Sequence, residues 1–267
     1  MDPWRPPGTL RIATWNVNSL RARMPRVEEF IGYAAPDILC MQETKVTDAA
    51  FPALAFRGLG YDHAHHGGAG RWNGVAILSR VGLDQITAGF DDDPEAESRF
   101  IAATCAGVRV ASVYVPNGRE VGTEHYRAKL AWLSQLRSHL DASADPAGDV
   151  IVCGDFNVAP EDRDVYDPSK FVGATHVSPP EREALQHILD WGLVDVFRRC
   201  QPQEKLFTWW DYRAGDFHNH RGMRIDLALA STSLAARARM ALIDRNARKG
   251  KLPSDHAPVI VDFDEAP

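Results

Sequence analysis

The sequence of 267 residues lacks the features that mark several classes of protein. No uninterrupted apolar run approaches the ~18 residues of a membrane span, and residues 1–8 lack the apolar core of a signal peptide. The four cysteines lie far apart and form no CxxC pair, so we expect reduced thiols rather than a disulfide framework. These absences predict a cytoplasmic protein without a membrane partner. No apolar stripe in the sequence calls for a second subunit, so we expect a monomer.

An excess of positive charge is also missing. The net charge is −6, from 30 Lys and Arg against 36 Asp and Glu, which is not the pattern of a protein that binds nucleic acid by bulk electrostatics. Only six of these cations are lysine and 24 are arginine, whose planar guanidinium suits phosphate contacts, although codon preference in a GC-rich genome explains the same bias. The 45% of apolar and 25% of charged residues exclude disordered and collagen-like chains.

Several catalytic motifs are absent as well. The chain has no GxxxxGK(S/T) segment, no GxSxG segment and no HExxH segment. These absences exclude a P-loop nucleotide site, a serine hydrolase with that nucleophile turn and a zinc protease of that type. No repeat, low-complexity tract or long linker interrupts the sequence. We therefore expect a flexible extension over residues 1–9 and a single domain over residues 10–267.

Short β-rich runs, each flanked by turn residues, recur along the chain. The runs are Leu10–Trp15, Ile38–Met41, Gly74–Leu78, Phe100–Thr104, Val108–Val115, Val150–Cys153, Ile225–Ala230 and Val259–Phe263. Helical patterns lie between some of them, from Arg21 to Tyr33 after Ser19 as N-cap, from Thr123 to Leu140, and from Ser178 to Trp191. Many strands with a few helices predict two sheets that pack face to face, with helices covering them.

Polar side chains stand where several of these runs end. The run that ends at Cys153 is followed by Gly154-Asp155-Phe156-Asn157, which puts a carboxylate and an amide at a sheet edge, although these residues also suit a plain turn. Asp226 interrupts an apolar run and must face solvent or find a partner. Similar positions add Asn16, Glu43, Asp255 and His256. Oxygen ligands of this kind suit Mg²⁺ or Mn²⁺ rather than Zn²⁺, and together with a histidine they indicate metal-assisted phosphoester hydrolysis.

Five segments in order along the chain match a known family. They are Thr14–Ala22, Leu39–Lys45, Gly154–Asn157, Arg221–Asp226 and Ser254–Pro258. The chain resembles the exonuclease III family of apurinic/apyrimidinic endonucleases, within the endonuclease/exonuclease/phosphatase superfamily. The resemblance implies an α/β fold that is a four-layered sandwich of two mixed β-sheets flanked by helices. It also implies cleavage of the phosphodiester 5′ to an abasic site in duplex DNA, with 3′→5′ exonuclease and 3′-phosphatase or 3′-phosphodiesterase activity at 3′ ends.

The resemblance also implies roles for individual residues. Glu43 resembles the principal metal-binding carboxylate, and Asp155 resembles the carboxylate that orients or deprotonates the attacking water. Asn157 resembles the amide that positions this aspartate. His256 is expected to contact a phosphate oxygen with Asp226 hydrogen-bonded behind it, and whether Asp155 or His256 takes the proton stays open. The implied ligands of Mg²⁺, or of Mn²⁺ as the alternative, are Asn16, Glu43, Asp155, Asn157, Asp255 and His256.

Other residues are expected to handle the substrate. Tyr114 should reach the scissile phosphate or the leaving oxygen, although a half-buried strand tyrosine is the plain alternative. Trp209 resembles the aromatic residue that enters the minor groove beside the extruded abasic sugar. The expected DNA contacts are Arg119, Trp209, Met223, Arg224 and His256. A group of basic residues between 237 and 251 forms either a phosphate-contacting face or an ordinary solvated surface.

Two other functions remain open at this point. A hydrolase of the same superfamily could act on a small phosphate substrate, but the Trp209 segment argues against it. A catalytically silent DNA-binding protein would have no need for the costly polar set of Glu43, Asp155, Asn157, Asp226 and His256. All these expectations require distant strand ends to converge into one anionic pocket.

Overall fold

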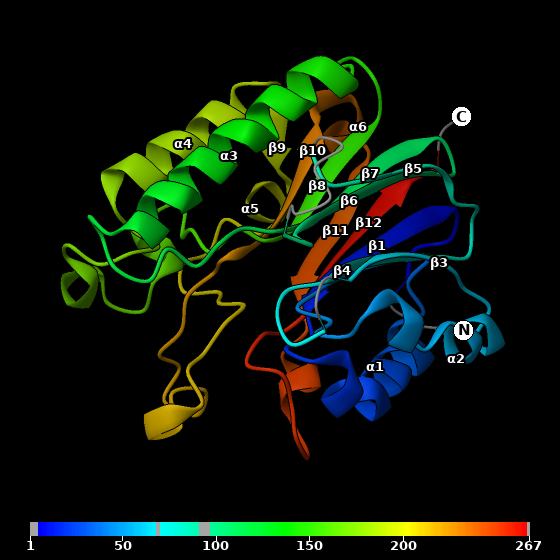
Figure 1. The fold of residues 1–267 in the computed structure, drawn as a ribbon, viewed down its shortest axis with the longest axis horizontal. Coiled ribbons are helices and arrows are strands. Elements are labelled where there is room, and N and C mark those ends of the chain that lie inside the picture. Colours follow the sequence, from blue (N-terminus) through cyan, green and yellow to red (C-terminus); the bar gives the residue numbers. More distant parts are fainter. Residues whose placement is uncertain (1–4, 68–69, 91–96, 266–267) are drawn as a thin grey trace.

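The computed structural model, in which residues 5–67, 70–90 and 97–265 are described, contains two mixed six-stranded β-sheets that lie face to face (Figure 1). The first sheet has the order β11-β12-β1-β2-β4-β3 and the second the order β5-β6-β7-β8-β10-β9. The strands of the first sheet are β1 (Thr9–Asn16), β2 (Ile38–Gln42), β3 (Asp62–His66), β4 (Val75–Ser79), β11 (Ala238–Ile243) and β12 (Val259–Asp264). Those of the second are β5 (Asp84–Ala88), β6 (Phe100–Cys105), β7 (Val108–Tyr114), β8 (Val150–Asp155), β9 (Leu193–Asp195) and β10 (Asp226–Ser231).

Helices cover the outer faces of both sheets, which completes four layers (Figure 1). The α-helices are α1 (Leu20–Ala34) and α2 (Ala53–Gly58) on the first sheet, α3 (Glu124–Ser143) and α4 (Pro179–Leu189) on the second, and the short α5 (Val196–Cys200) and α6 (Thr232–Ala236). Short 3₁₀ turns are η1 (Asp48–Ala50), η2 (Asp162–Asp164), η3 (Pro168–Phe171), η4 (Arg213–Gly215) and η5 (Arg245–Arg248). The predicted sandwich is therefore confirmed. Among the described residues, no helix is long and apolar enough to span a membrane.

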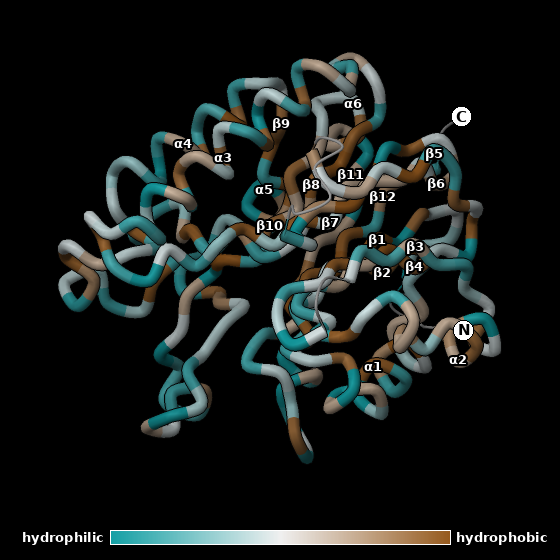
Figure 2. The backbone as a smooth tube through the Cα atoms, in the orientation of Figure 1, coloured by the Kyte–Doolittle hydropathy of each residue, from teal (hydrophilic) through white to brown (hydrophobic). Residues whose placement is uncertain are grey.

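Three apolar clusters join the four layers. One fills the space between the two sheets, a second lies between the second sheet and the α3–α4 pair, and a third lies between the first sheet and α1 with α2. Apolar segments run along the strands, and hydrophilic segments prevail in many of the connecting loops (Figure 2). Because burial of apolar surface is the main driving force for folding, these three clusters hold the sheets rigidly enough to fix the loops at their ends.

The predicted elements correspond to observed ones, with local differences. Thr123 caps α3, since its side chain accepts a hydrogen bond from the Tyr126 N–H, and Ser178 forms the predicted capping box with Glu181. Ser19 occupies the predicted N-cap position of α1, but its φ is 84° and its side chain makes no capping hydrogen bond. The strands β3, β5, β9 and β11 were not predicted; the first two are polar or exposed edge strands without a continuous apolar run.

Two further predictions concern the N-terminal segment and the cysteines. Residues 1–4 of the expected flexible extension lie outside the described residues. Of the remainder, Arg5 forms an ion pair with Asp37, and β1 begins at Thr9. All four cysteines are free thiols, as predicted, and Cys200 is the one that is not buried.

The topology brings the ends of several strands to one edge of the sandwich. The pairs β1–β2 and β7–β8 are parallel, so their carboxyl ends lie together. Strand β10 runs antiparallel to β8 and begins at this edge, where Asp226 pairs with Asp155. Tyr114 pairs with Asp155 from the other side. Segments that are far apart in the sequence therefore meet at this edge.

Candidate active site

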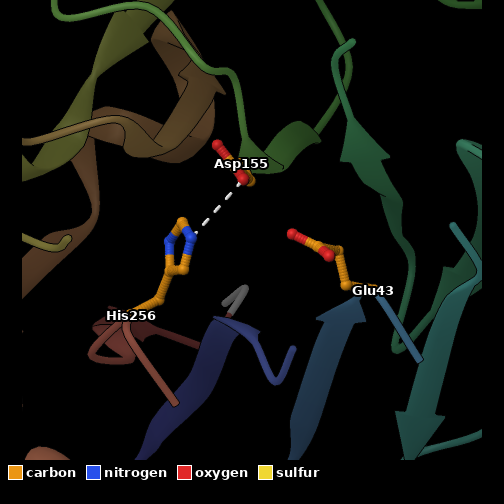
Figure 3. Close-up of side chains that lie close together, drawn as sticks. All are labelled: Glu43, Asp155 and His256. Carbon is orange, nitrogen blue, oxygen red and sulfur yellow. Dashed lines mark ion pairs between the residues drawn. The ribbon is translucent and has the colours of Figure 1, made fainter. Parts of the chain in front are cut away.

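Three side chains from separate segments meet at the convergent strand ends (Figure 3). Glu43 follows β2, Asp155 ends β8, and His256 precedes β12. One ligand atom from each lies within 4.8 Å of the other two. Asp155 is 1% exposed and His256 is 3% exposed, whereas the Glu43 side chain retains 16% exposure. The convergence expected from the sequence is therefore observed for these three side chains, and Glu43 is the most exposed of them.

Asn16 at the end of β1 joins the two carboxylates. Its Nδ2 donates to Glu43 Oε1 at 2.8 Å and to Asp155 Oδ2 at 2.9 Å. Asn16 is fully buried, so these hydrogen bonds are not weakened by competition with water. The amide holds two acidic groups side by side against their mutual repulsion.

His256 is held by a carboxylate on each side. Its Nδ1 lies 2.8 Å from Asp226 Oδ2, and its Nε2 lies 3.8 Å from Asp155 Oδ2. Burial lowers the pKa of His256, but the attraction of Asp226 and Asp155 outweighs it and raises the pKa to about 10. The imidazole is therefore protonated at neutral pH, with Asp226 fixing the orientation of the ring.

Asp155 sits in a crowded anionic environment. Burial raises its pKa to about 7, with further contributions from Asp226 and Glu43 that His256 partly opposes. One oxygen of Asp226, Oδ1, is buried without a hydrogen-bond partner. Buried carboxylates that repel one another in this way are stabilised by a cation, and oxygen donors are the ligands that Mg²⁺ and Mn²⁺ prefer. The two carboxylates of Glu43 and Asp155 therefore fit a divalent cation, whereas Asn16 turns its Nδ2 towards them and its metal ligation stays a prediction.

Asn157 is tied to both Asp155 and the loop after β7. Its N–H donates to Asp155 Oδ1 at 2.9 Å, and its Nδ2 donates to the Val115 carbonyl at 2.9 Å. Its Oδ1 accepts from Asn117 Nδ2 at 3.2 Å. These contacts suit the predicted positioning role, whereas metal ligation by Asn157 stays a prediction.

Tyr114 faces the same pocket from the end of β7. Burial raises the pKa of its phenol well above the usual value, and the nearby carboxylates of Glu43 and Asp155 add to the effect. The Arg99 guanidinium carbon lies 4.7 Å from the centre of the Tyr114 ring. Tyr114 therefore stays protonated and can donate a hydrogen bond.

Asp255 lies beside this cluster rather than within it. Its Oδ1 accepts from Asn18 Nδ2 at 3.0 Å and its Oδ2 accepts from Trp209 Nε1 at 3.1 Å. The backbone of Trp209 pairs with that of His256 and of Met223. The Trp209 ring is thus fixed at the rim, half-buried, while metal ligation by Asp255 stays a prediction.

The DNA contact predicted for Arg224 is wrong. Its side chain is fully buried, with Nε 2.7 Å from Asp164 Oδ1 and Nη1 2.7 Å from Asp195 Oδ2. Pairing with two carboxylates satisfies the guanidinium inside the protein, so it supports the wall of the site instead. The neighbouring Met223 is 5% exposed and packs against Val165, so its contact with DNA stays a prediction.

The remaining predicted contacts with DNA are Arg119 and the basic residues between 237 and 251. Arg119 is exposed, and its N–H donates to Asn117 Oδ1 at 3.1 Å, which places it next to Asn157; its DNA contact stays a prediction. Two of the basic residues between 237 and 251 are engaged within the protein. Arg237 pairs with Asp149 and Arg248 is 7% exposed, so both are used inside the fold.

Sequence reasoning missed several residues that shape the site. Lys45 Nζ lies 2.7 Å from Glu43 Oε2 and 2.6 Å from Asn18 Oδ1. The position of Lys45, two residues after Glu43, could have identified it from the sequence as a residue of the site. Lys129 on α3 and Glu181 on α4 form a fully buried ion pair behind Asn157. Nothing in their local sequence distinguishes them from ordinary charged residues of a helix.

Known proteins resemble this chain over nearly all of its length. A family model described as the endonuclease/exonuclease/phosphatase family matches residues 13–256. Exodeoxyribonuclease III of Haemophilus influenzae is 34% identical over 267 residues, covering 95% of this chain and 100% of the relative. An AP endonuclease from Archaeoglobus fulgidus superposes with a TM-score of 0.92 at 41% identity, covering 96% of this chain and 99% of the other. The 3′ phosphatase NExo from Neisseria, bound to a product DNA hairpin, gives 0.90 at 38% identity, covering 96% and 99%.

Proposed function

The chain belongs to the endonuclease/exonuclease/phosphatase family and is a hydrolytic nuclease that acts on DNA, and from this premise we propose its specific reaction. It hydrolyses the phosphodiester 5′ to abasic sites in duplex DNA, and it removes nucleotides and phosphate groups from 3′ ends. Mg²⁺ is the proposed cofactor, with Mn²⁺ as the alternative. The convergence of Glu43, Asp155 and His256 within 4.8 Å of one another supports this proposal more than any other observation.

The cation would be held on the Glu43 side of the pocket, by Glu43 and Asp155 with Asn16 beside them. When bound, it supplies a Lewis acid that offsets the negative charge growing on the phosphate. The residue types support this role, because the group contains two carboxylates and no thiolate.

The protein's own residues supply the other parts of the reaction. His256 carries a proton on Nε2 and is proposed to donate it as a hydrogen bond to a phosphate oxygen. Since this protonated histidine is a poor base, Asp155 is the proposed group that orients the attacking water and accepts its proton. The Tyr114 phenol is proposed to donate to the scissile phosphate or the leaving oxygen. Each well-placed donor of this kind lowers the barrier by about 3–4 kcal/mol.

Trp209 is the proposed contact with the DNA beside the lesion. Its ring is half-buried, and its indole N–H is anchored on Asp255 next to His256. An apolar ring at this position can occupy the gap left by a missing base, where unstacking costs little. Arg119 and Met223 are also proposed to contact the DNA.

A single assay tests the proposed reaction. The protein is incubated with a labelled duplex that contains one abasic analogue and with a duplex that carries a 3′-phosphate, each in Mg²⁺, in Mn²⁺ and in EDTA. Incision at the analogue and release of phosphate, both abolished by EDTA, are expected. Turnover of inositol phosphates or nucleotides without cutting of DNA would favour the small-phosphate hydrolase instead. Binding without cutting in either metal would contradict an enzymatic function.

A further inference from the structure

A fully buried ion pair lies behind the active site, between α3 and α4. Lys129 and Glu181 both have side chains with 0% exposure, and the Lys129 ammonium contacts the Glu181 carboxylate. Burial raises the pKa of Glu181, but the Lys129 ammonium and the hydrogen bonds from Ser178 and His176 outweigh it and lower the pKa. The pair is therefore ionised. Burying two charges costs free energy that packed apolar residues would not cost. Stabilisation of the fold therefore does not explain why this site holds an ion pair.

The ammonium group also binds the two loops that carry the functional amides. Lys129 Nζ donates to the Asn157 carbonyl at 2.6 Å and to the Asn117 carbonyl at 3.3 Å. With Glu181 as the third partner, all three N–H bonds of the ammonium are used. The loops in question follow β7 and β8, the adjacent parallel strands that end in Tyr114 and Asp155.

Glu181 anchors this arrangement to the segment before α4. Its Oε1 accepts from the His176 N–H at 3.0 Å and from Thr175 Oγ1 at 2.7 Å. His176 in turn places its Nδ1 2.5 Å from the Asn157 carbonyl. The ion pair therefore clamps three segments of chain around one peptide group.

The clamped carbonyl and the N–H that holds Asp155 belong to the same residue, Asn157, on either side of its Cα. Asn157 has a φ of 50°, in the left-handed region, which asparagine adopts more readily than most residues with a side chain. Its N–H donates to Asp155 Oδ1, and the other oxygen of Asp155 faces Asn16 and His256. A shift of Asn157 would move this N–H and rotate the carboxylate that is proposed to orient the attacking water.

We propose that Lys129 is a positioning residue of this active site: its buried ammonium holds the Asn157 carbonyl, fixes the backbone of this residue and thereby aims the Asp155 carboxylate. The inference rests on the proposed function and deepens it. Lys129 touches no substrate, so its removal should lower kcat without changing the affinity for DNA. A misplacement of reacting groups by about 1 Å can cost on the order of 100-fold in rate.

The first test removes both charges together. Lys129→Met alone would leave Glu181 buried and unpaired, so the variant to examine is Lys129→Met with Glu181→Gln. We expect it to unfold within a few degrees of the wild type, to bind an abasic duplex in EDTA with unchanged Kd, and to lose about 10- to 100-fold in kcat with unchanged KM. The matched control is Arg137→Met with Asp141→Asn, which removes an ion pair between more exposed residues of the same helix. The control should keep the wild-type kcat.

A second pair of variants moves Lys129 without removing charge. A Cβ on Gly118 would lie 2.8 Å from Lys129 Cδ, whereas a Cβ on Gly122 would meet nothing within 4 Å. Both glycines have positive φ, 83° and 87°, so Gly118→Ala and Gly122→Ala strain the backbone alike. Only Gly118→Ala should lower kcat at unchanged Kd for DNA.

The outcomes separate this inference from the proposed function. A folded double variant with the wild-type kcat, or equal kcat values for Gly118→Ala and Gly122→Ala, would overturn the role of Lys129. If the double variant does not fold, the two glycine variants decide. A wild-type protein that cuts none of the DNA substrates would instead overturn the proposed function.

Discussion

The two halves of the pocket are held in place by different means. The Glu43 half comprises Asn16, Asn18, Glu43 and Lys45, and backbone hydrogen bonds join its two loops, with the Ser19 N–H donating to the Glu43 carbonyl at 2.7 Å. The Asp155 half comprises Tyr114, Asp155 and Asn157, and side chains from distant helices brace it. The comparison teaches that one edge of the sandwich can be held by backbone hydrogen bonds between neighbouring loops in one half and by side chains from distant helices in the other.

The difference also appears in the charges near each carboxylate. In the Glu43 half, Lys45 approaches Glu43 from the partly exposed side of the pocket. In the Asp155 half, the compensating cation is His256, which is buried and held by Asp226. Removal of single groups should therefore affect the two halves unequally.

The largest effect is expected for Asp155→Asn. The amide cannot accept the proton of the attacking water, so incision should fall by about 10²- to 10⁴-fold. Binding of an abasic duplex in EDTA should stay close to that of the wild type, because the remaining contacts with DNA are intact. Single-turnover incision and fluorescence anisotropy measure the two quantities. A wild-type rate in this variant would remove Asp155 from its proposed role.

Asp226→Asn should have the next largest effect. Asp226 holds His256 at 2.8 Å and favours its charged form, so the amide would weaken the phosphate contact and free the ring to turn. Loss of an orienting group of this kind typically costs about 10- to 100-fold in activity. The measurement is kcat on the abasic duplex, with Asp141→Asn on the exposed face of α3 as the control. Equal activities of Asp226→Asn and the control would contradict the account.

One buried histidine in each half should make an unfavourable contribution to stability in mild acid. Burial lowers the pKa of His65, next to Thr44, and of His176, next to Asn157, each to about 4. Because the unfolded chain binds these protons from about pH 6.5, the stabilisation is complete above that pH and is lost as the pH falls towards 4. Between pH 7 and pH 5 each group should cost about 1–2 kcal/mol.

Urea unfolding at the two pH values measures this loss. His65→Gln and His176→Gln should each reduce the dependence on pH, whereas His125→Gln, an exposed residue of α3, should leave it unchanged. A pH dependence that neither buried variant alters would show that these histidines are not held neutral by the fold.

The smallest effect is expected for Lys45→Met in the Glu43 half. The ammonium lies 2.7 Å from Glu43 and repels any cation bound there, so its removal should strengthen metal binding by about two- to fivefold, the usual range for a partly exposed ion pair. The Mg²⁺ concentration that gives half-maximal activity should fall accordingly. An unchanged or higher requirement for Mg²⁺ would mean that Lys45 does not act on this carboxylate.

The sequence predicts the fold wherever strands are apolar and flanked by turns, as for β1 and β8. It fails for β3, whose residues Asp-His-Ala-His-His form an edge strand that is stabilised by its neighbour β4 rather than by its own pattern. Strand register and sheet order arise from contacts between distant segments, which one sequence cannot supply.

The candidate site divides in the same way. Glu43 and Asp155 were predictable because chemistry requires acidic groups at strand ends. The burial of Arg224 was not, because Asp164, its partner, lies 60 residues away. The burial of Lys129 could not be predicted either, since its partner Glu181 lies on another helix, 52 residues along the chain. Motifs predict the groups that react, but not the long-range pairs that hold them.

The central claim is that the ends of strands in two sheets form one cation site. Metal binding by the wild type and two variants tests this claim most directly. Mn²⁺ binding is measured by electron paramagnetic resonance without DNA, for the wild type, Glu43→Gln and Asp155→Asn. The account predicts that the wild type binds Mn²⁺ and that each substitution, one in each half, weakens binding by about tenfold or more. Wild-type affinity in either variant would contradict a site shared between the two sheets.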